Sequence, residues 1–483
     1  VVERGRNNLL TDLLFASEQV DNTAHDVVFF AGRDGDAEGD AAWRAALAAV
    51  TPDDVRRVAA RWLVDPTVVV LAEDAPTTLP VRTAHAERQV RVMRASPEDA
   101  GLDRSAIASL YLAWSGGVQA EDPSTAGVTD AWALAVTTGA GSLGSVALAA
   151  ELDRHGASLR AVAGRSSVGL QLTAPVGGMD AAIDVLADVV RAPRFEASEW
   201  ERLQDEQLLD LDTLDDRPDE VLHRRLWSLA WKGHPWAVQR SRTQIRGLRT
   251  EAFEAFHGRW ITRGGLVVGV AGPVHDRVPA WLDRLLVGLP DDPPSFTPPE
   301  LGPQPEGHFT SSGGSEQAIV VAATRTPSLH HAHTAALRVA VGLLGAQSGP
   351  LFLDLRERRS LAYSVFARMA EAPTAGLLTV GLATDPARKG VARRALLDAM
   401  ARVADEGPTD AELARTKAMV LGQLAAAHQS AAGRAVGLAL AGLYGVEPGT
   451  DAVRREIAAV DRQAVKDALG ALAPLFTVTV APG

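Results

Sequence analysis

The sequence predicts an α+β fold in which tandem domains repeat one plan. Three observations lead to this prediction. Apolar segments with the two-residue period of strands alternate with amphipathic segments of helical period, and two proline-rich stretches divide the chain. At 483 residues the chain is long enough for about three domains, and its hydrophobic content of 46% is ordinary for globular protein. The chain therefore has enough apolar material to bury several separate cores.

The first 73 residues predict the tail of a domain, because they match residues 411–481 in an ordered series. The matches are Arg4, Arg6 and Leu10 with Arg415, Lys417 and Leu421, residues 47–50 with residues 457–460, Val55 with Val465, and residues 67–70 with residues 477–480. Each copy predicts a long helix, a short helix, a third helix and a terminal strand. The alternative is a chance similarity between alanine-rich helices.

Two linkers divide the rest of the chain. Residues 75–86 contain Pro76 and Pro80, and residues 289–307 contain seven prolines. Proline at that density excludes helix and central strand, and it stiffens a spacer. We therefore expect three parts: residues 1–75, the C-terminal part of a preceding domain; residues 84–290; and residues 305–483.

The middle part predicts mixed strands and helices in alternation. Strands are expected at residues 109–114, 168–172 and 265–270, and helices at residues 129–136, 146–154, 179–191 and from a Ser198 cap to about residue 214.

The last part repeats the plan. Strands are expected at residues 318–323, 363–369 and 376–383, the last two as an antiparallel hairpin, and helices at residues 335–344, 351–358, 391–404 and 413–428.

Composition excludes several classes of function. The formal net charge is −12, and no basic stripe stands out, so we expect no nucleic-acid partner. Cysteine is absent, which removes disulfides, thiolate metal sites and cysteine nucleophiles. No apolar run reaches the roughly 18 residues of a membrane span. We expect a soluble protein and leave open whether it is periplasmic or cytoplasmic. The first residue is not methionine, so we expect the chain to begin inside a longer polypeptide.

One short segment carries chemistry. In residues 350–366 an apolar start leads into a basic cluster, and Tyr363 follows Arg356 by seven residues. This segment resembles the arginine/tyrosine signature of the pitrilysin/insulinase family of zinc peptidases, whose metal motif is H-x-x-E-H. The resemblance extends over nearly the whole chain, through residues 127–129, Gly139, residues 156–159, Phe195, His234-Pro235 and residues 253–257. It implies metallopeptidase-like domains that form one shell of a two-shell clamshell.

The resemblance also implies that the metal site is degenerate. Active members present histidine, glutamate and histidine at i, i+3 and i+4, on one face of a helix. Here the corresponding positions are Asp130, Ala133 and Leu134, with Asp210 at the distal ligand position. We therefore expect no metal in this chain and zinc in an active half. Two alternatives stay open: Asp130 and Asp210 hold a hard cation, or Asp130 is solvated while Ala133 and Leu134 are core.

By the resemblance, Arg356 and Tyr363 serve a zinc site in the other shell. There a guanidinium holds the scissile carbonyl and a tyrosine hydroxyl donates to the oxyanion. The implied partners are an active metallopeptidase half, in the same polypeptide or in another chain, and a peptide substrate. Alone, the chain is not expected to hydrolyse peptides. The alternative for the pair is structural, with Arg356 bound to Glu357 or Asp354.

A second function stays open: an inactive subunit that binds peptides or scaffolds an assembly, like the core subunits related to mitochondrial processing peptidase. The strand after Gly156 could then add a peptide by β-augmentation. Arg165 is predicted either to contact a peptide carboxylate or to lie on the surface. His330, His331 and His333 are predicted to lie in a surface loop.

Overall fold

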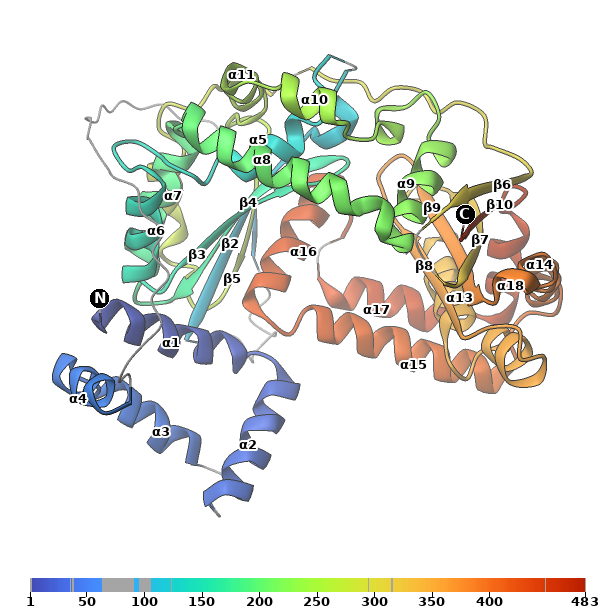
Figure 1. Ribbon diagram of the computed structural model, residues 1–483, viewed down its shortest axis with the longest axis horizontal. Helices are drawn as coiled ribbons and strands as arrows, with labels where there is room; N and C mark the ends of the chain where they lie inside the picture. The colour runs from blue at the N-terminus through green and yellow to red at the C-terminus, as the bar shows by residue number, and fades with distance from the viewer. Residues whose placement is uncertain are drawn as a thin grey trace.

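The computed structural model describes residues 2–34, 36, 39–62, 91–94, 106–122, 124–293, 295–313, 316–447 and 449–482. It contains two five-stranded sheets with helices on both faces, one toward the left and one toward the right in Figure 1. The α+β prediction, with mixed sheets packed by helices, is confirmed. The expected strand at residues 67–70 and the linker at residues 75–86 lie outside the described residues.

The two sheets have the same topology. The first has the order β1-β5-β2-β4-β3, and the second has the order β6-β10-β7-β9-β8. In each sheet the first pair is parallel and the other three pairs are antiparallel. The strands are β1 (Arg91–Arg94), β2 (Ile107–Ser115), β3 (Ser158–Ala163), β4 (Ser167–Pro175), β5 (Val267–Ala271), β6 (His308–Ser312), β7 (Ala318–Thr326), β8 (Ser364–Ala370), β9 (Gly376–Thr384) and β10 (Phe476–Ala481).

Helices fill the connections. Those between and after the strands of the first sheet are α5 (Val128–Ala135), α6 (Ser145–Arg154), α7 (Met179–Arg191), α8 (Ala197–Thr213), α9 (Pro218–Ala230), α10 (Arg242–Gly247), α11 (Thr250–Trp260) and α12 (Val278–Leu285). Those of the second sheet are α13 (Thr334–Gly345), the π-helix η4 (Phe352–Arg358), α14 (Lys389–Glu406), α15 (Asp410–Ala427), α16 (Ala431–Tyr444), α17 (Thr450–Ala459) and α18 (Arg462–Gly470).

Most predicted elements lie within two residues of the observed ones, and the others differ as follows. Helix α8 has Glu196 rather than Ser198 as its N-cap, and the Glu196 side chain makes no capping bond. Residues 352–358 form a π-helix instead of an ordinary helix. The sequence predicts no element at α9, α10, α11, α12, β1 or β6.

The two sheets exchange helices. Helix α16 follows the second sheet's strand β9 in the chain, yet it packs on β1, β2 and β5 of the first sheet. In return, α9 packs on β6, β7 and β10 of the second sheet. Strand alternation explains why both faces are apolar: in β2, Leu110 and Leu112 lie in the main core of the first sheet, whereas Tyr111 and Ala113 lie against α16.

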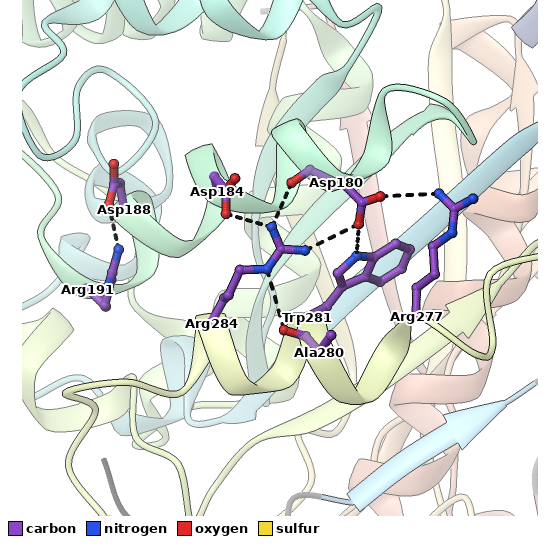
Figure 2. Close-up of polar contacts among 8 residues, drawn as sticks. All are labelled: Asp180, Asp184, Asp188, Arg191, Arg277, Ala280, Trp281 and Arg284. Atoms are coloured by element: carbon purple, nitrogen blue, oxygen red, sulfur yellow. Dashed lines mark hydrogen bonds and ion pairs between the residues drawn. The ribbon is translucent and has the colours of Figure 1, made fainter. Parts of the chain in front are cut away.

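Helices α7 and α12 cover the other face of the first sheet, and a polar network joins them (Figure 2). The fully buried Trp281 donates its indole N–H to Asp180 Oδ1 at 2.6 Å. Arg277 and Arg284 each pair with the Asp180 carboxylate at 3.3 Å. The Trp281 bond, followed by these arginines, lowers the pKa of Asp180. The network therefore ties the two helices together at neutral pH.

Each sheet and the helices between and after its strands form one unit of the chain. A buried histidine makes the first unit sensitive to acid. The indole of Trp132 donates to Nδ1 of His257 at 3.2 Å, and Nε2 of His257 bonds the carbonyl of Val190 at 2.8 Å. Burial lowers the pKa of His257 from 6.5 to about 4. Protonation would remove the acceptor that Trp132 needs, so the folded state keeps this imidazole neutral.

We therefore predict a pH-dependent loss of stability that His257 causes. Between pH 6.5 and about 4 the unfolded state binds a proton that the folded state does not. His257 therefore leaves the free energy of unfolding unchanged above pH 6.5 and lowers it by about 3 kcal/mol as the pH approaches 4. Urea unfolding across this range measures it. His257→Gln, which can keep both hydrogen bonds, should show a shallower slope, and equal slopes would contradict the assignment.

Among the described residues, four helices precede the first sheet: α1 (Val2–Ala16), α2 (Val20–Asp34), α3 (Gly39–Ala48) and α4 (Pro52–Trp62). They have the same order and similar lengths as α15, α16, α17 and α18. Each copy thus has four helices, one more than the sequence predicts. The predicted starts at Thr51 and Asp461 are confirmed, since each side chain accepts from the N–H three residues on. No helix in the described ranges has both the length and the hydropathy of a membrane span.

Candidate functional site

Helix α5, to which the sequence assigns the degenerate metal motif, begins at a buried carboxylate. Glu121 accepts hydrogen bonds from the N–H groups of Gly127 and Thr129, both at 2.8 Å. Burial raises the pKa of Glu121 against the effect of these bonds. Gly127 has a φ of +89°, which costs glycine little and other residues more. The turn and the carboxylate together start the helix beside strand β3.

The motif positions on α5 carry one acid and two apolar side chains. Oδ2 of Asp130 lies 3.5 Å from Nε of Arg240. Ala133 is half-buried, and Leu134 is 41% exposed. The side of α5 that faces the core is filled by Trp132 instead. Leu134 therefore is a surface residue rather than a core residue.

The distal position has an arginine of its own. Oδ1 of Asp210, on α8, accepts from Nη2 of Arg217 at 2.6 Å. Asp130 and Asp210 are thus each paired with a different cation and not with a shared one. In the part of the chain that the structure describes, no group of three or more His, Cys, Asp or Glu residues could hold a metal ion. The rings of His331 and His333, in the turn before α13, stack with their centroids 4.9 Å apart. These two histidines also belong to no such group.

Next to the motif, Arg165 is held in place by an aromatic ring. Its guanidinium carbon lies 3.1 Å from the ring centroid of Trp227, and Nη2 lies 3.2 Å from Nε2 of His223. Burial lowers the pKa of Arg165 to about 10, while the charge of Asp130 acts in the opposite direction. The side chain is therefore half-buried and charged at neutral pH, and is not a freely solvated surface arginine.

Arg165 lines a cavity of about 400 Å³ that lies between the two units. Its wall includes Tyr111, Arg160, Trp236 and Tyr444. The hydroxyl of Tyr444 lies 2.9 Å from Oγ of Ser167. Burial raises the pKa of Tyr444, and it raises that of Tyr111 to about 12. Both phenols therefore stay neutral, as hydrogen-bond donors need to be.

Two of the chain's three tyrosines line this cavity, and the sequence did not indicate it. Tyr111 lies in a predicted strand, but the face it occupies is defined by α16, which comes from more than 300 residues later. Only the exchange of helices brings Tyr444 to the same place.

Strand β3 forms the outer edge of the first sheet. It pairs with β4 on one side, and no other described strand pairs with its second edge. An edge with unpaired N–H and C=O groups is a template for an added strand. The peptide-binding role predicted for the strand after Gly156 thus has an available edge.

Arg356 and Tyr363 lie at the equivalent edge of the second sheet. Arg356 belongs to η4, and its guanidinium carbon lies 4.8 Å from the ring centroid of Phe352. Its Nε is 3.9 Å from Oε1 of Glu357, whereas Asp354 pairs with other arginines. Tyr363 directly precedes edge strand β8 and is 57% exposed. Neither residue lines the cavity beside Arg165.

The local backbone at this edge is unusual. A π-helix is rare, and it frequently occurs at functional sites. Ser360, between the two candidate residues, has a φ of +47°, the one positive value outside glycine among the described residues. Its carbonyl accepts from Nη1 of Arg388 at 2.7 Å. Such strain persists only where surrounding contacts hold it, which is common at sites of recognition.

Comparisons with known proteins bear on the family and the fold of the chain. A family model described as "Insulinase (Peptidase family M16)" matches residues 102–244, and one described as "Peptidase M16 inactive domain" matches residues 248–420. An uncharacterized zinc protease of Mycobacterium leprae is 29% identical to this chain, and the match covers 50% of this chain and 57% of that protein. An uncharacterized zinc protease of Mycobacterium tuberculosis is also 29% identical, and that match covers 58% of this chain and 66% of that protein. The chain thus spans less than two thirds of these relatives.

Solved structures show the same fold at low identity. An M16 inactive domain from Pseudomonas fluorescens superposes with a TM-score of 0.75 at 20% identity, covering 84% of this chain and 99% of that one. A protease from Helicobacter pylori gives a TM-score of 0.74 at 15% identity, with 83% and 99% covered.

Proposed function

Because the chain belongs to the M16 (insulinase) family of peptidases, we propose that it is the metal-free half of a two-half zinc endopeptidase. The zinc-bearing half, with its H-x-x-E-H motif, lies upstream in the same polypeptide or in a partner chain. Arg356 orients the scissile carbonyl of a peptide held between the halves, and Tyr363 donates to the oxyanion.

One observation carries the proposal. The two carboxylates that remain at the motif positions, Asp130 and Asp210, each pair with a separate arginine. A site arranged in this way presents no vacant ligand set, so chemistry at a metal requires another half. Tyr363 is 57% exposed in the chain by itself, so the proposal requires the zinc-bearing half to enclose it.

The test is reconstitution. The isolated chain and the isolated H-x-x-E-H half of the same organism should each cleave a quenched-fluorescence peptide at background rate, and their mixture should cleave it with turnover. If the halves are joined in one polypeptide, separate expression of the two parts serves the same purpose. Full turnover by the zinc half alone would contradict the proposal.

We predict that the isolated chain retains no stoichiometric zinc. After incubation with zinc and desalting, metal analysis should give well below one ion per chain, because arginines occupy the carboxylates at the motif positions. Asp130→Asn with Asp210→Asn is the matched control and should give the same value. One zinc per chain that this control loses would assign a metal site to these two carboxylates.

A second function is favoured by the free edge of β3 and the cavity beside it. In that case the chain binds peptides without taking part in their cleavage. Peptide binding by the isolated chain, together with turnover of the mixture that does not depend on Tyr363, would select this alternative.

A further inference from the structure

Helix α2 carries an apolar stripe that the described residues leave exposed. Val20, Ala24, Val27, Val28 and Ala31 lie on one face at helical spacing, and all five are exposed. Val20 is 73% exposed and Val28 is 71% exposed. An apolar stripe of this kind normally faces a core, so α2 presents a surface that has a partner elsewhere.

The last domain contains a counterpart of α2 with a visible partner. Helices α1 to α4 follow the order and lengths of α15 to α18, which pairs α2 with α16. Aligned without a gap, the five residues of the α2 stripe fall on Ala431, Ala435, Leu438, Ala439 and Gly442.

These five residues of α16 are all buried, and they form its contact with the first sheet. The approach is close: a Cβ placed on Gly269 of β5 would lie 2.0 Å from the carbonyl oxygen of Ala435. The stripe that is exposed on α2 is therefore, position for position, the stripe that α16 lays on a sheet.

In the described part of the chain, neither sheet has a face open to α2. The second face of the first sheet is covered by α16, and that of the second sheet by α9. A second copy of the chain has both faces occupied in the same way. The sheet that receives α2 therefore belongs to a different M16 domain.

Contacts with the rest of the chain hold the start of α2 in place, whereas its apolar stripe is exposed. Arg4 of α1 pairs with Asp153 of α6 at 3.7 Å. At the corner between α1 and α2, Oε1 of Glu18 accepts from the N–H of Ala431 at 3.1 Å, so it caps α16. Figure 1 shows α2, in blue, leading away from both sheets. The helix is thus anchored at one end and extends away from the body of the chain.

We propose that the α2 stripe docks on the open face of a five-stranded sheet in the zinc-bearing half, as α16 docks on the first sheet here. This inference rests on the proposed function, because it takes the two-half arrangement as given. It adds a surface by which this chain joins the zinc-bearing half: α2, in the part expected to end the preceding domain, completes a sheet there. Valine replaces alanine at positions 20 and 28, so the receiving sheet needs small residues beneath them.

The chain has no cysteine, so Val28→Cys introduces a single thiol on the stripe. Asn22→Cys, on the opposite face of α2, is the matched control. Both thiols should react rapidly with a maleimide in the isolated chain. With the H-x-x-E-H half present, Cys at position 28 should react at least about tenfold more slowly, because only the opened interface reacts. The control should keep its rate.

A second variant tests affinity. Val28→Asp leaves the isolated chain folded, since the side chain is exposed, but it places an unpaired carboxylate in the interface. It should weaken assembly of the halves by more than about tenfold, measured by the Kd of the mixture.

The outcomes separate this inference from the proposed function. A mixture that cleaves peptide while the thiol at position 28 stays reactive overturns the docking alone. Protection at position 28, with turnover that does not depend on Tyr363, overturns the residue roles alone. Protection in the isolated chain at the mass of a dimer assigns the stripe to a second copy and overturns the docking. Failure of the halves to assemble overturns both.

Discussion

The Tyr363→Phe variant is expected to lower the turnover number of the reconstituted enzyme by about 10²–10³-fold, the loss typical of one oxyanion donor. Only the hydroxyl is removed, and the ring is 57% exposed, so folding and assembly should not change. Steady-state kinetics should show the loss in kcat with little change in KM, because the bond forms only as the oxyanion develops.

A matched pair of arginine variants extends this test. Arg356→Lys keeps the charge but loses the planar pair of donors, so kcat/KM should fall. Arg358→Lys, two residues along the same π-helix, is the control and should leave turnover unchanged. Wild-type turnover by Tyr363→Phe would remove the proposed role of the hydroxyl, and the second function described above would then be preferred.

Gly269→Ala is expected to produce the largest loss of stability among single substitutions to alanine at the contact between the units. The added Cβ would stand 2.0 Å from the carbonyl oxygen of Ala435 and 2.8 Å from the N–H nitrogen of Ala439. Both atoms belong to the backbone of α16, so the helix has to move away from the sheet. Overpacking of this kind costs about 3 kcal/mol. Urea unfolding followed by tryptophan fluorescence measures it.

Two glycines provide the comparison for Gly269. In Gly442→Ala the three atoms nearest the new Cβ belong to the side chains of Met93 and Val267, which can adjust, so the loss of stability should be smaller. Gly422, inside α15, has nothing within 4 Å, and Gly422→Ala should gain about 0.5–1 kcal/mol from helix propensity. An unfolding midpoint of Gly269→Ala equal to the wild-type value would show that α16 does not pack as described.

Elements with a strong local pattern were predictable. The helix at residues 179–191 was predicted with the observed bounds, because its apolar residues repeat at helical spacing on one face. The strand at residues 109–114 was predicted because it is apolar on both faces. The sequence predicts neither α9 nor the fourth helix of the repeat. The reason is that α9 and α16 each pack on a sheet of the other unit, so their apolar faces have no partner nearby in the sequence.

The candidate site shows the same division. Alignment with a motif is enough to predict that Asp130, Ala133, Leu134 and Asp210 occupy the zinc-ligand positions. It cannot predict which cations neutralise the two carboxylates, since Arg240 comes from the segment before α10 and Arg217 from the turn before α9. The cavity lined by Tyr111 and Tyr444 likewise depends on where α16 packs.

The order of residues alone was enough to identify the family resemblance and the repeated domain plan, and to predict the missing metal ligands, because these depend on residue type and local period. Packing decided which helix covers which sheet, which arginine meets which acid, and that the α2 stripe stays exposed while the α16 stripe is buried. The reason is physical: an apolar face has the same sequence whether it is covered or open, and only the neighbouring sheet, far away in the chain, distinguishes the two.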